Sequence, residues 1–224
     1  MSRSEGFLDV CHEVGGAIRS FRRGEPVLIR DFDDREAETD LVYPAARVTA
    51  GDVARMRNDA GGLVCVALSD TISNAYDLPF LADAVEHPSA GTADIDYDDH
   101  SSFSLTVNHR ETRTGITDLE RAKTIRALAT AAADTETFDF AATFRSPGHV
   151  HVLRAAPGLL ASRQGHTELS LALAEAADLT PATVVCEMLD DDTGTALSRA
   201  DAKQYARETG IWYVEGRDIV SLLR

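Results

Sequence analysis

Lysine is almost missing from this chain of 224 residues: it stands only at Lys123 and Lys203, and arginine supplies the other twenty basic residues. Acidic residues number 37 against 22 basic ones, so the formal net charge is −15. Nucleic acids and anionic membrane surfaces are bound through basic footprints. We therefore expect neither nucleic acid nor membrane as a partner.

Cysteine is also scarce, and the three that occur, Cys11, Cys65 and Cys186, have no metal-binding spacing. Any disulfide would leave one thiol over, which favours a reducing compartment. The chain has no apolar signal core near its N-terminus and no run of about 18 apolar residues that would span a bilayer. We therefore expect a cytoplasmic protein.

Linkers and internal repeats are missing as well. No Pro/Gly/Ser-rich tract divides the chain, and no segment recurs. The nearest thing to a break is the acidic stretch 86–102, which we interpret as a surface loop. Residues 1–224 are therefore expected to form one domain, and this length suffices for a full hydrophobic core.

Hydrophobic periodicity predicts helices and strands that are interleaved along the chain. The predicted helices cover 10–21, 49–60, 117–132, 169–177 and 198–209, and the predicted strands cover 26–29, 63–68, 103–107, 150–154, 184–189 and 212–214. Such interleaving indicates a layered α/β or α+β domain rather than a bundle or a sandwich. Periodicity leaves the strand order open.

What the chain does contain is an acidic segment, residues 33–40, with acids at every second position toward its end. In extended backbone, Glu36, Glu38 and Asp40 would share one face at spacings of roughly 7 Å. A row of carboxylates suits a divalent cation or acid–base chemistry. An acidic surface turn is the equally open alternative at this point.

A second cluster, residues 163–168, lies directly before a long apolar run and is predicted to form the N-terminus of a helix. Backbone N–H groups at such an end bind anions, and Arg163 and Thr167 add a charge and a hydroxyl suited to a phosphate. Gly165 allows a ligand to approach closely. The positive end of the helix dipole is expected to keep His166 neutral, and thus able to ligate a metal.

These segments, together with others in the same order, resemble the 3,4-dihydroxy-2-butanone 4-phosphate synthase family from about Gly24 to the C-terminus. The matching blocks are 26–29, 34–42, 61–68, 113–116, 121–126, 147–150, 163–168 and 186–187. Each block alone is unspecific, whereas their combination is highly specific. Ala37 departs from the pattern, because relatives often carry Gly or Asn there; 151–152 and 190–192 depart as well.

The resemblance implies an α+β fold, in which a single layered domain is built around a twisted mixed β-sheet flanked by helices. It also implies a homodimer with active sites near the subunit interface. The implied enzyme is a lyase of riboflavin biosynthesis that converts D-ribulose 5-phosphate to L-3,4-dihydroxy-2-butanone 4-phosphate, with loss of C4 as formate. Enolisation and skeletal rearrangement gain from a cation that stabilises oxyanions, and the implied cofactor is Mg²⁺ or Mn²⁺.

By match to the family motif, Glu36 and His166 are the expected metal ligands. His149 and Glu187 match positions that the family needs for catalysis, and Glu38 is expected to accept a proton. On pattern alone, His149 is more typical of a loop and Glu187 of a surface strand end. Which group is the base and which the acid stays open. The expected substrate contacts are Arg35, Glu36, Asp40, Arg163, Gln164, Gly165, His166, Thr167 and Glu187, with Arg163 and Thr167 at the phosphate.

Other groups carry less defined expectations. Cys65 lies in an apolar strand and is expected to be buried near the site without a catalytic role. Thr114 and Gly115 are either loop contacts near the substrate or a plain turn. Four other histidines, at positions 12, 87, 100 and 109, are expected at the surface. Two other functions stay open: another metal-dependent phosphosugar lyase or aldolase, and a non-catalytic sugar-phosphate-binding protein.

The scarcity of lysine, with 23 aspartates, is similar to the composition of proteins from salt-loving cells. We therefore expect a halophilic archaeal source. At molar ionic strength the Debye length is about 3 Å, so self-repulsion of the acidic surface would be screened. The chain lacks the length and the cysteine triplet of a fused zinc-dependent GTP cyclohydrolase, so we expect the single-function form of the enzyme.

Overall fold

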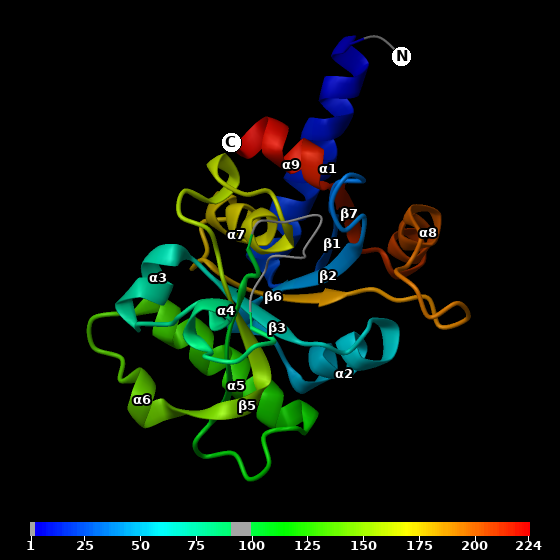
Figure 1. Ribbon diagram of the computed structural model, residues 1–224. Coiled ribbons are helices and arrows are strands. Elements are labelled where there is room, and N and C mark those ends of the chain that lie inside the picture. Colours follow the sequence, from blue (N-terminus) through cyan, green and yellow to red (C-terminus); the bar gives the residue numbers. More distant parts are fainter. Residues whose placement is uncertain (1–2, 91–99) are drawn as a thin grey trace.

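The computed structural model describes residues 3–90 and 100–224, and its centre is a seven-stranded mixed β-sheet (Figure 1). The strand order is β4-β5-β3-β6-β2-β1-β7. Neighbours are antiparallel except β3 with β5 and β1 with β7, which are parallel. The predicted mixed sheet is confirmed. The strands are β1 (Val27–Arg30), β2 (Thr39–Pro44), β3 (Cys65–Leu68), β4 (Phe103–His109), β5 (Phe144–Arg154), β6 (Ala182–Glu187) and β7 (Trp212–Glu215).

Both faces of the central strands are buried, because their side chains alternate between two hydrophobic cores. In β3, Val66 and Leu68 belong to one core, whereas Cys65 and Ala67 belong to the other. Strands β1, β2 and β6 alternate in the same way. Burial on both faces explains why β3 is an unbroken apolar run in the sequence.

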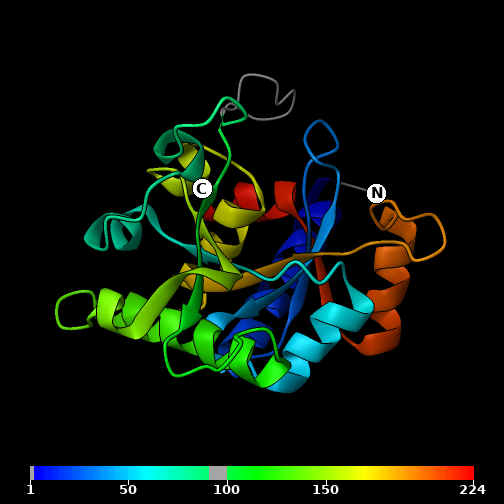
Figure 2. The same cartoon turned by 60° about the horizontal axis from the view of Figure 1, so that its bottom comes forward.

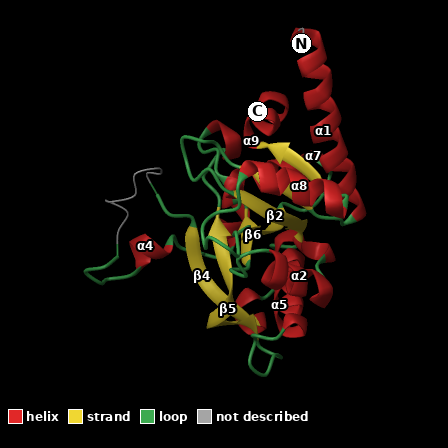
Figure 3. Cartoon of the chain, turned by 90° about the vertical axis from the view of Figure 1, so that its right-hand side faces the viewer, coloured by secondary structure: helices red, strands yellow, loops and turns green. Residues whose placement is uncertain are grey.

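Helices cover the two faces in separate groups (Figures 1 and 2). The face that carries Cys65 is covered by α1 (Arg3–Arg23), α7 (His166–Ala176) and α9 (Gly216–Leu223). The opposite face is covered by α2 (Ala50–Asp59), α5 (Asp118–Ala133) and α8 (Arg199–Thr209), with α2 and α5 side by side. Figure 3 shows that the N-terminal part of α1 rises clear of the sheet. The helices of the described residues include none long and apolar enough to cross a membrane.

Capping side chains fix where the helices begin. Thr49 accepts the backbone N–H of Asp52 before α2, and Asp52 caps the Thr49 N–H in return. Thr117 accepts the N–H of Glu120 before α5, and Ser198 caps α8 in the same way. A capping oxygen satisfies one of the free N–H groups of the first helical turn. The helix starts predicted at 117 and 198 are therefore confirmed.

Several boundaries differ from the prediction. β5 begins at Phe144, six residues before the predicted strand, and β6 ends at Glu187. The acidic segment is a turn over residues 33–36, and β2 follows it. The predicted surface loop 86–102 lies largely outside the described residues. Periodicity predicts none of the short helices, because four to six residues give no helical pattern; these are α3 (Asp70–Ala75), α4 (Leu81–Ala84) and α6 (Phe140–Thr143).

Candidate active site

The register of three strands places acidic side chains beside the N-terminus of α7. Asp40 of β2 is paired with Glu187 of β6, and Val185 of β6 is paired with Cys65 of β3. Cys65 and Val185 belong to the core under α7. Glu187 lies two residues from Val185 and therefore on the same face of the sheet, and its partner Asp40 shares that face.

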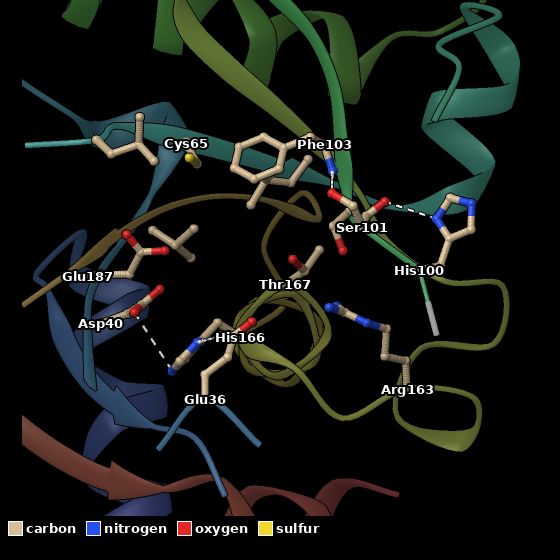
Figure 4. Close-up of a pocket in the computed structure, with 14 residues that line it drawn as sticks. Glu36, Asp40, Cys65, His100, Ser101, Phe103, Arg163, His166, Thr167 and Glu187 are labelled. Carbon is tan, nitrogen blue, oxygen red and sulfur yellow. Dashed lines mark hydrogen bonds and ion pairs between the residues drawn. The ribbon is translucent and has the colours of Figure 1, made fainter. Parts of the chain in front are cut away.

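A cavity lies between these strands and α7 (Figure 4). Figure 4 shows Glu36, Asp40 and His166 close together, with Glu187 beside them, and Arg163 at the other end. The cavity thus has an acidic end and a basic end. Its lining residues are Glu36, Asp40, Leu63, Cys65, His100, Ser101, Ser102, Phe103, Leu153, Arg163, His166, Thr167, Val185 and Glu187.

His166, the first residue of α7, joins the groups of the acidic end. Its Nδ1 lies 3.3 Å from Oε2 of Glu36, and its Nε2 lies 3.7 Å from Oδ1 of Asp40. Burial lowers the pKa of His166, but Asp40, Glu36 and Asp31 outweigh burial and raise that pKa to about 9. Without a metal, these carboxylates favour the charged ring, contrary to the expectation of a neutral imidazole.

Glu36 reaches the cavity from a tight turn. The carbonyl of Phe32 accepts the N–H groups of Arg35 and Ala37, both at 3.1 Å. Ala37 has a φ of 54°, in the left-handed region that Gly or Asn adopts more easily. This turn places Glu36 so that its side chain lies beside His166.

The predicted row of carboxylates on one strand face is wrong. β2 begins only at Thr39, so Asp40 alone of the three acids lies in a strand. Glu36 and Asp40 nevertheless line the same cavity, while Glu38 is half-buried and does not line it. Burial and the charge of Glu187 raise the pKa of Glu38, so this carboxyl group still interacts electrostatically with the acidic end.

Negative charge is crowded at the acidic end. Burial, opposed by His166 and reinforced by Glu187, raises the pKa of Asp40 to about 7. Burial and the nearby Glu36 also raise the pKa of Glu187. Burial acts on Glu36 as well, but its contact with His166 prevails and lowers the pKa of Glu36. Groups that titrate near neutrality can exchange protons, and the remaining charge attracts a cation.

Asp31 extends this end into a metal-binding arrangement that the sequence pattern does not predict. Ligand atoms of Asp31, Glu36 and His166 all lie within 4.8 Å of one another. In the part of the chain that is described, Oδ1 of Asp40 and Nε2 of His166 are buried without a hydrogen-bond partner. Carboxylates with one imidazole fit Mg²⁺ or Mn²⁺. The available signal for Asp31 was its place directly after a buried strand.

The basic end is built around Gly165, the N-cap residue of α7. A Cβ on Gly165 would lie 2.8 Å from Nη1 of Arg163 and 3.2 Å from Nη2 of Arg35, so glycine lets two guanidinium groups approach the helix end. Arg163 donates to Oε2 of the buried Glu168 at 2.8 Å. Glu168 also accepts the N–H of Ala156 at 2.9 Å. Glu168 thus fixes the direction of Arg163, a role that sequence reasoning missed.

Other predicted positions near this end have different outcomes. Thr167 is buried and lines the cavity. Gln164 does not line it and donates to the carbonyl of Leu160 at 3.4 Å, so its contact with a substrate stays a prediction. His100 is half-buried and lines the cavity, with its Nε2 3.2 Å from Oδ2 of Asp83. Its side chain is 38% exposed, so His100 is partly at the surface, as predicted, and also lines the cavity.

His149 lies outside the cavity, at an exposed position of β5. Its backbone N–H donates to Oδ1 of Asn108 on β4 at 2.9 Å. Nδ2 of the buried Asn108 donates to the carbonyl of Thr114 at 3.2 Å. The structure thus places Thr114 against the support of His149, and within one protomer it does not bring His149 and the cavity together.

A layered α/β/α domain with an acidic and a basic end in one cavity defines a divalent-metal-dependent enzyme. The chain belongs to the 3,4-dihydroxy-2-butanone 4-phosphate synthase family, whose sequence model matches residues 16–222. It is 50% identical over 220 residues to the synthase of Methanosarcina mazei. That alignment covers 92% of this chain and 89% of the relative. The Candida albicans synthase structure has a TM-score of 0.78 and 31% identity, covering 94% and 97% of the two chains. A synthase structure in complex with two magnesium ions has a TM-score of 0.75 and 29% identity, covering 93% and 94%.

Proposed function

We propose that this chain is the lyase that converts D-ribulose 5-phosphate to L-3,4-dihydroxy-2-butanone 4-phosphate and formate in riboflavin biosynthesis. One observation carries the proposal: in a member of this family, a single cavity has a carboxylate–histidine cluster at one end and a guanidinium group at the other. A phosphorylated ketose has matching ends. Its carbonyl and hydroxyl oxygens suit a cation, and its phosphate suits arginine.

Glu36 and His166 would hold the divalent cation, Mg²⁺ or Mn²⁺, with Asp31 beside them. When bound, the cation supplies Lewis-acid stabilisation of substrate oxygens that become negatively charged. Glu36 suits this role because its lowered pKa keeps the carboxylate ionised. His166 must release its proton to become a ligand, so affinity for the cation rises with pH.

Glu38 and Glu187 are proposed to move protons, and Asp40 is proposed to contact the substrate. The reaction removes a proton beside a ketone and later returns one, so it needs groups that work in both directions. Burial raises the pKa of both Glu38 and Glu187, which brings each closer to neutrality. The pairing of Asp40 with Glu187 across β2 and β6 keeps these two carboxyl groups on one face of the sheet.

The phosphate is proposed to bind at the N-terminus of α7. Arg163 supplies a fork of N–H groups, Thr167 supplies a hydroxyl, and Arg35 approaches the same helix end. Gly165 permits this approach, and we keep the backbone of Gln164 as a predicted contact. Helix N-termini bind anions through free N–H groups and the helix dipole.

We further propose a homodimer in which His149 of one protomer enters the cavity of the other. His149 is exposed and lies outside its own cavity. Ile116 and Leu119, close to the loop that supports it, are 49% and 75% exposed, and Leu63 at the cavity is 37% exposed. Burial of such apolar groups in a two-fold interface is favourable. This arrangement would complete a site that one protomer leaves without His149.

The test is an assay of formate release from ribulose 5-phosphate by the purified chain. We expect formate and the four-carbon phosphate in equal amounts, only with Mg²⁺ or Mn²⁺, and loss of activity in Glu36→Gln. Glu175→Gln, at an exposed position of α7, is the matched control and should behave as wild type. Cleavage without formate would indicate another phosphosugar lyase or aldolase, and binding without turnover would indicate a sugar-phosphate-binding protein.

We also propose that residues 1–224 act as one catalytic domain in the cytoplasm of a salt-loving archaeon. The three free cysteines and the net charge of −15 support this setting. Molar potassium chloride would screen the repulsion among the acids, so the melting temperature should rise from tens of millimolar to molar salt. Ordinary surface ion pairs weaken over that range. A flat or falling melting temperature would contradict salt adaptation and leave the activity untouched.

A further inference from the structure

The side chain of Asn108 has a fixed orientation. Its Oδ1 accepts the backbone N–H of His149 at 2.9 Å, and its Nδ2 donates to the carbonyl of Thr114 at 3.2 Å. A backbone N–H can only donate and a carbonyl can only accept, so these two partners determine which end of the amide is oxygen. Asn108 is only 3% exposed, so water competes little for these bonds.

The same amide also contacts the imidazole ring of His149. Nδ1 of His149 lies 3.1 Å from Nδ2 and 3.3 Å from Oδ1 of Asn108. Nδ2 has a second hydrogen to donate to a bare Nδ1, and Oδ1 has a second lone pair to accept a proton carried by Nδ1. The amide therefore supports the ring in either state of Nδ1. Nε2, on the opposite side of the ring, is the nitrogen directed away from this support.

The loop behind Asn108 is itself held by α5. Glu120 accepts the N–H groups of Arg113 at 2.6 Å, Thr114 at 3.3 Å and Gly115 at 2.9 Å. Hydrogen bonding, chiefly from Thr114, lowers the pKa of Glu120 to about 2 and keeps it a charged acceptor. A Cβ on Gly115 would lie 2.2 Å from the Asn108 amide, so glycine is required there. The amide thus rests on a rigid loop.

We infer that Asn108 is a positioning residue that directs Nε2 of His149 toward the substrate in both protonation states of the ring. The inference rests on the proposed function, because His149 is assigned to catalysis there. A carboxylate in this place would favour the imidazolium, whereas a neutral amide holds the ring without selecting its charge. While Nδ1 keeps its proton and donates it to Oδ1 of Asn108, His149 can take up and release a proton at Nε2 and keep its orientation.

Charged and titratable groups also occur on the elements around this pair. They are His109 on β4, Arg145 and His151 on β5, and Arg113 and Glu120 on the adjoining loop and helix. Arg145 donates to the carbonyl of Arg113 at 3.3 Å, and Glu120 is engaged by the loop. A carboxylate introduced at position 108 would add a negative charge in direct contact with the His149 ring.

The direct test is ¹⁵N NMR of the histidine rings, with the His149 signals assigned by their loss in His149→Gln. In Asn108→Asp we expect the midpoint of the His149 ring titration to rise by about 1–3 pH units, since a carboxylate would contact Nδ1. Asn58→Asp, at an exposed position of α2, adds the same charge elsewhere and should leave the midpoint unchanged. This readout does not depend on turnover.

Kinetics test the positioning role. Asn108→Ala should lower kcat by about 10–100-fold while KM stays within about threefold, because orientation and not binding is lost. In Asn108→Asp the acid limb of the kcat profile should shift together with the NMR midpoint. Asn58→Ala is the control. If Asn108→Ala does not fold, Asn108→Ser and Asn108→Asp decide the question.

The outcomes separate this inference from the proposed function. An unchanged ring titration in Asn108→Asp, or an unchanged kcat in Asn108→Ala, would overturn the positioning role. If the wild type releases no formate while the ring still responds to Asn108→Asp, the support of the ring by Asn108 is upheld and the proposed reaction is wrong. Matched shifts in NMR and kcat would support both.

Discussion

The cavity and the β4–β5 pair hold their histidines in opposite ways. His166 is buried and lies between Glu36 and Asp40, which favour its charged form. His149 is exposed and is held by the neutral amide of Asn108. Fixed negative charge around an imidazole suits the binding of a cation, whereas a neutral support lets an imidazole change its charge. The comparison therefore supports the proposal that His166 is a metal ligand and that His149 carries a proton.

The two regions also differ in whether their groups lie together in one cavity of a single chain. The acidic end draws its groups from one protomer: a turn, two strands and the start of α7. In the β4–β5 pair, Asn108 supports His149, which does not line the cavity described above. Under the proposed function, the acidic end binds a cation, and His149 completes the cavity of a second chain.

The largest expected effect comes from substituting a proposed metal ligand at the acidic end. Glu36→Gln and His166→Ala should each lower kcat by ~10³-fold or more, because each removes a group that would hold the charge-stabilising cation. Asp31→Asn should cost less, about 10–100-fold, if Asp31 orients the ligands. Formate release at saturating Mg²⁺ measures turnover, and calorimetry measures Mg²⁺ binding. Near-normal turnover in Glu36→Gln or His166→Ala would remove that residue from the ligand set.

The next largest effect tests whether the cavity needs His149 of a second chain. His149→Ala alone should lower kcat by about 10²–10⁴-fold, as expected for loss of an acid–base group. A co-assembled mixture of His149→Ala and Glu36→Gln chains should recover about one quarter of wild-type activity. Half of the dimers would be mixed, and each mixed dimer would have one intact cavity out of two.

The control for that mixture combines two defects of the acidic end. Glu36→Gln chains mixed with His166→Ala chains should stay inactive, because both cavities of a mixed dimer would carry a defect. No recovery in the His149→Ala mixture would mean that His149 serves the cavity of its own chain. Normal kcat in His149→Ala alone would mean that His149 does not act in catalysis. Different affinity tags on the two variant chains, purified in sequence, confirm that chains have exchanged.

At the basic end a smaller effect is expected. Arg163→Lys should raise KM about tenfold with a lesser change in kcat, because lysine cannot reproduce the fork that Glu168 orients toward a phosphate. Glu168→Gln should change KM in the same direction. Saturation curves for ribulose 5-phosphate measure both, with Arg207→Lys at an exposed position of α8 as control. An unchanged KM in Arg163→Lys would place the phosphate elsewhere.

Sequence reasoning predicted the chemical groups better than their geometry. Glu36, His166 and Arg163 come together in one cavity as the motif blocks imply. The alternation of acids was interpreted as extended backbone, but two hydrogen bonds to Phe32 close a turn there. Alanine is not a usual residue for the left-handed conformation of that turn, so no local signal marks it.

Other features depend on contacts between distant segments. Glu168 contacts Arg163 within its own segment, but its other oxygen accepts the N–H of Ala156, 12 residues away. Asn108 supports His149 because β4 and β5 pair with an irregular register between Val107 and Asn108. Periodicity reports which face of an element is buried, and it contains no information on which polar atoms meet across elements.

The metal-free acidic end should make stability depend on pH. The pKa of Asp40 is raised from 3.8 to about 7, so its contribution is present at low pH and is lost as the pH rises through 7. The pKa of His166 is raised from 6.5 to about 9, so its contribution is present below about 6.5 and is lost as the pH rises through 9. Both contributions therefore make the folded protein less stable as the pH rises.

We therefore expect the melting temperature of the metal-free protein to fall by at least ~3 °C between pH 6 and pH 9, measured in molar potassium chloride. Added Mg²⁺ should raise the melting temperature more at pH 8.5 than at pH 6, since it competes with protons for the same groups. Asp40→Asn should weaken the dependence, and Asp191→Asn at the surface should not. A melting temperature that rises with pH would contradict the assigned charges.

The smallest expected effect concerns the backbone that directs Glu36. Ala37 has a φ of 54°, which costs an L-residue about 1–2 kcal/mol, while glycine would gain about 0.4–1 kcal/mol more chain entropy on unfolding. Ala37→Gly should therefore stabilise the fold by up to about 1 kcal/mol and change kcat less than about twofold. Ala54→Gly, in the middle of α2, should have the opposite sign, because glycine destabilises a helix interior. Calorimetric melting at one pH and salt concentration resolves such differences; a lower melting temperature in Ala37→Gly would show that the turn near the acidic end is unstrained, and that its geometry depends on side chains alone.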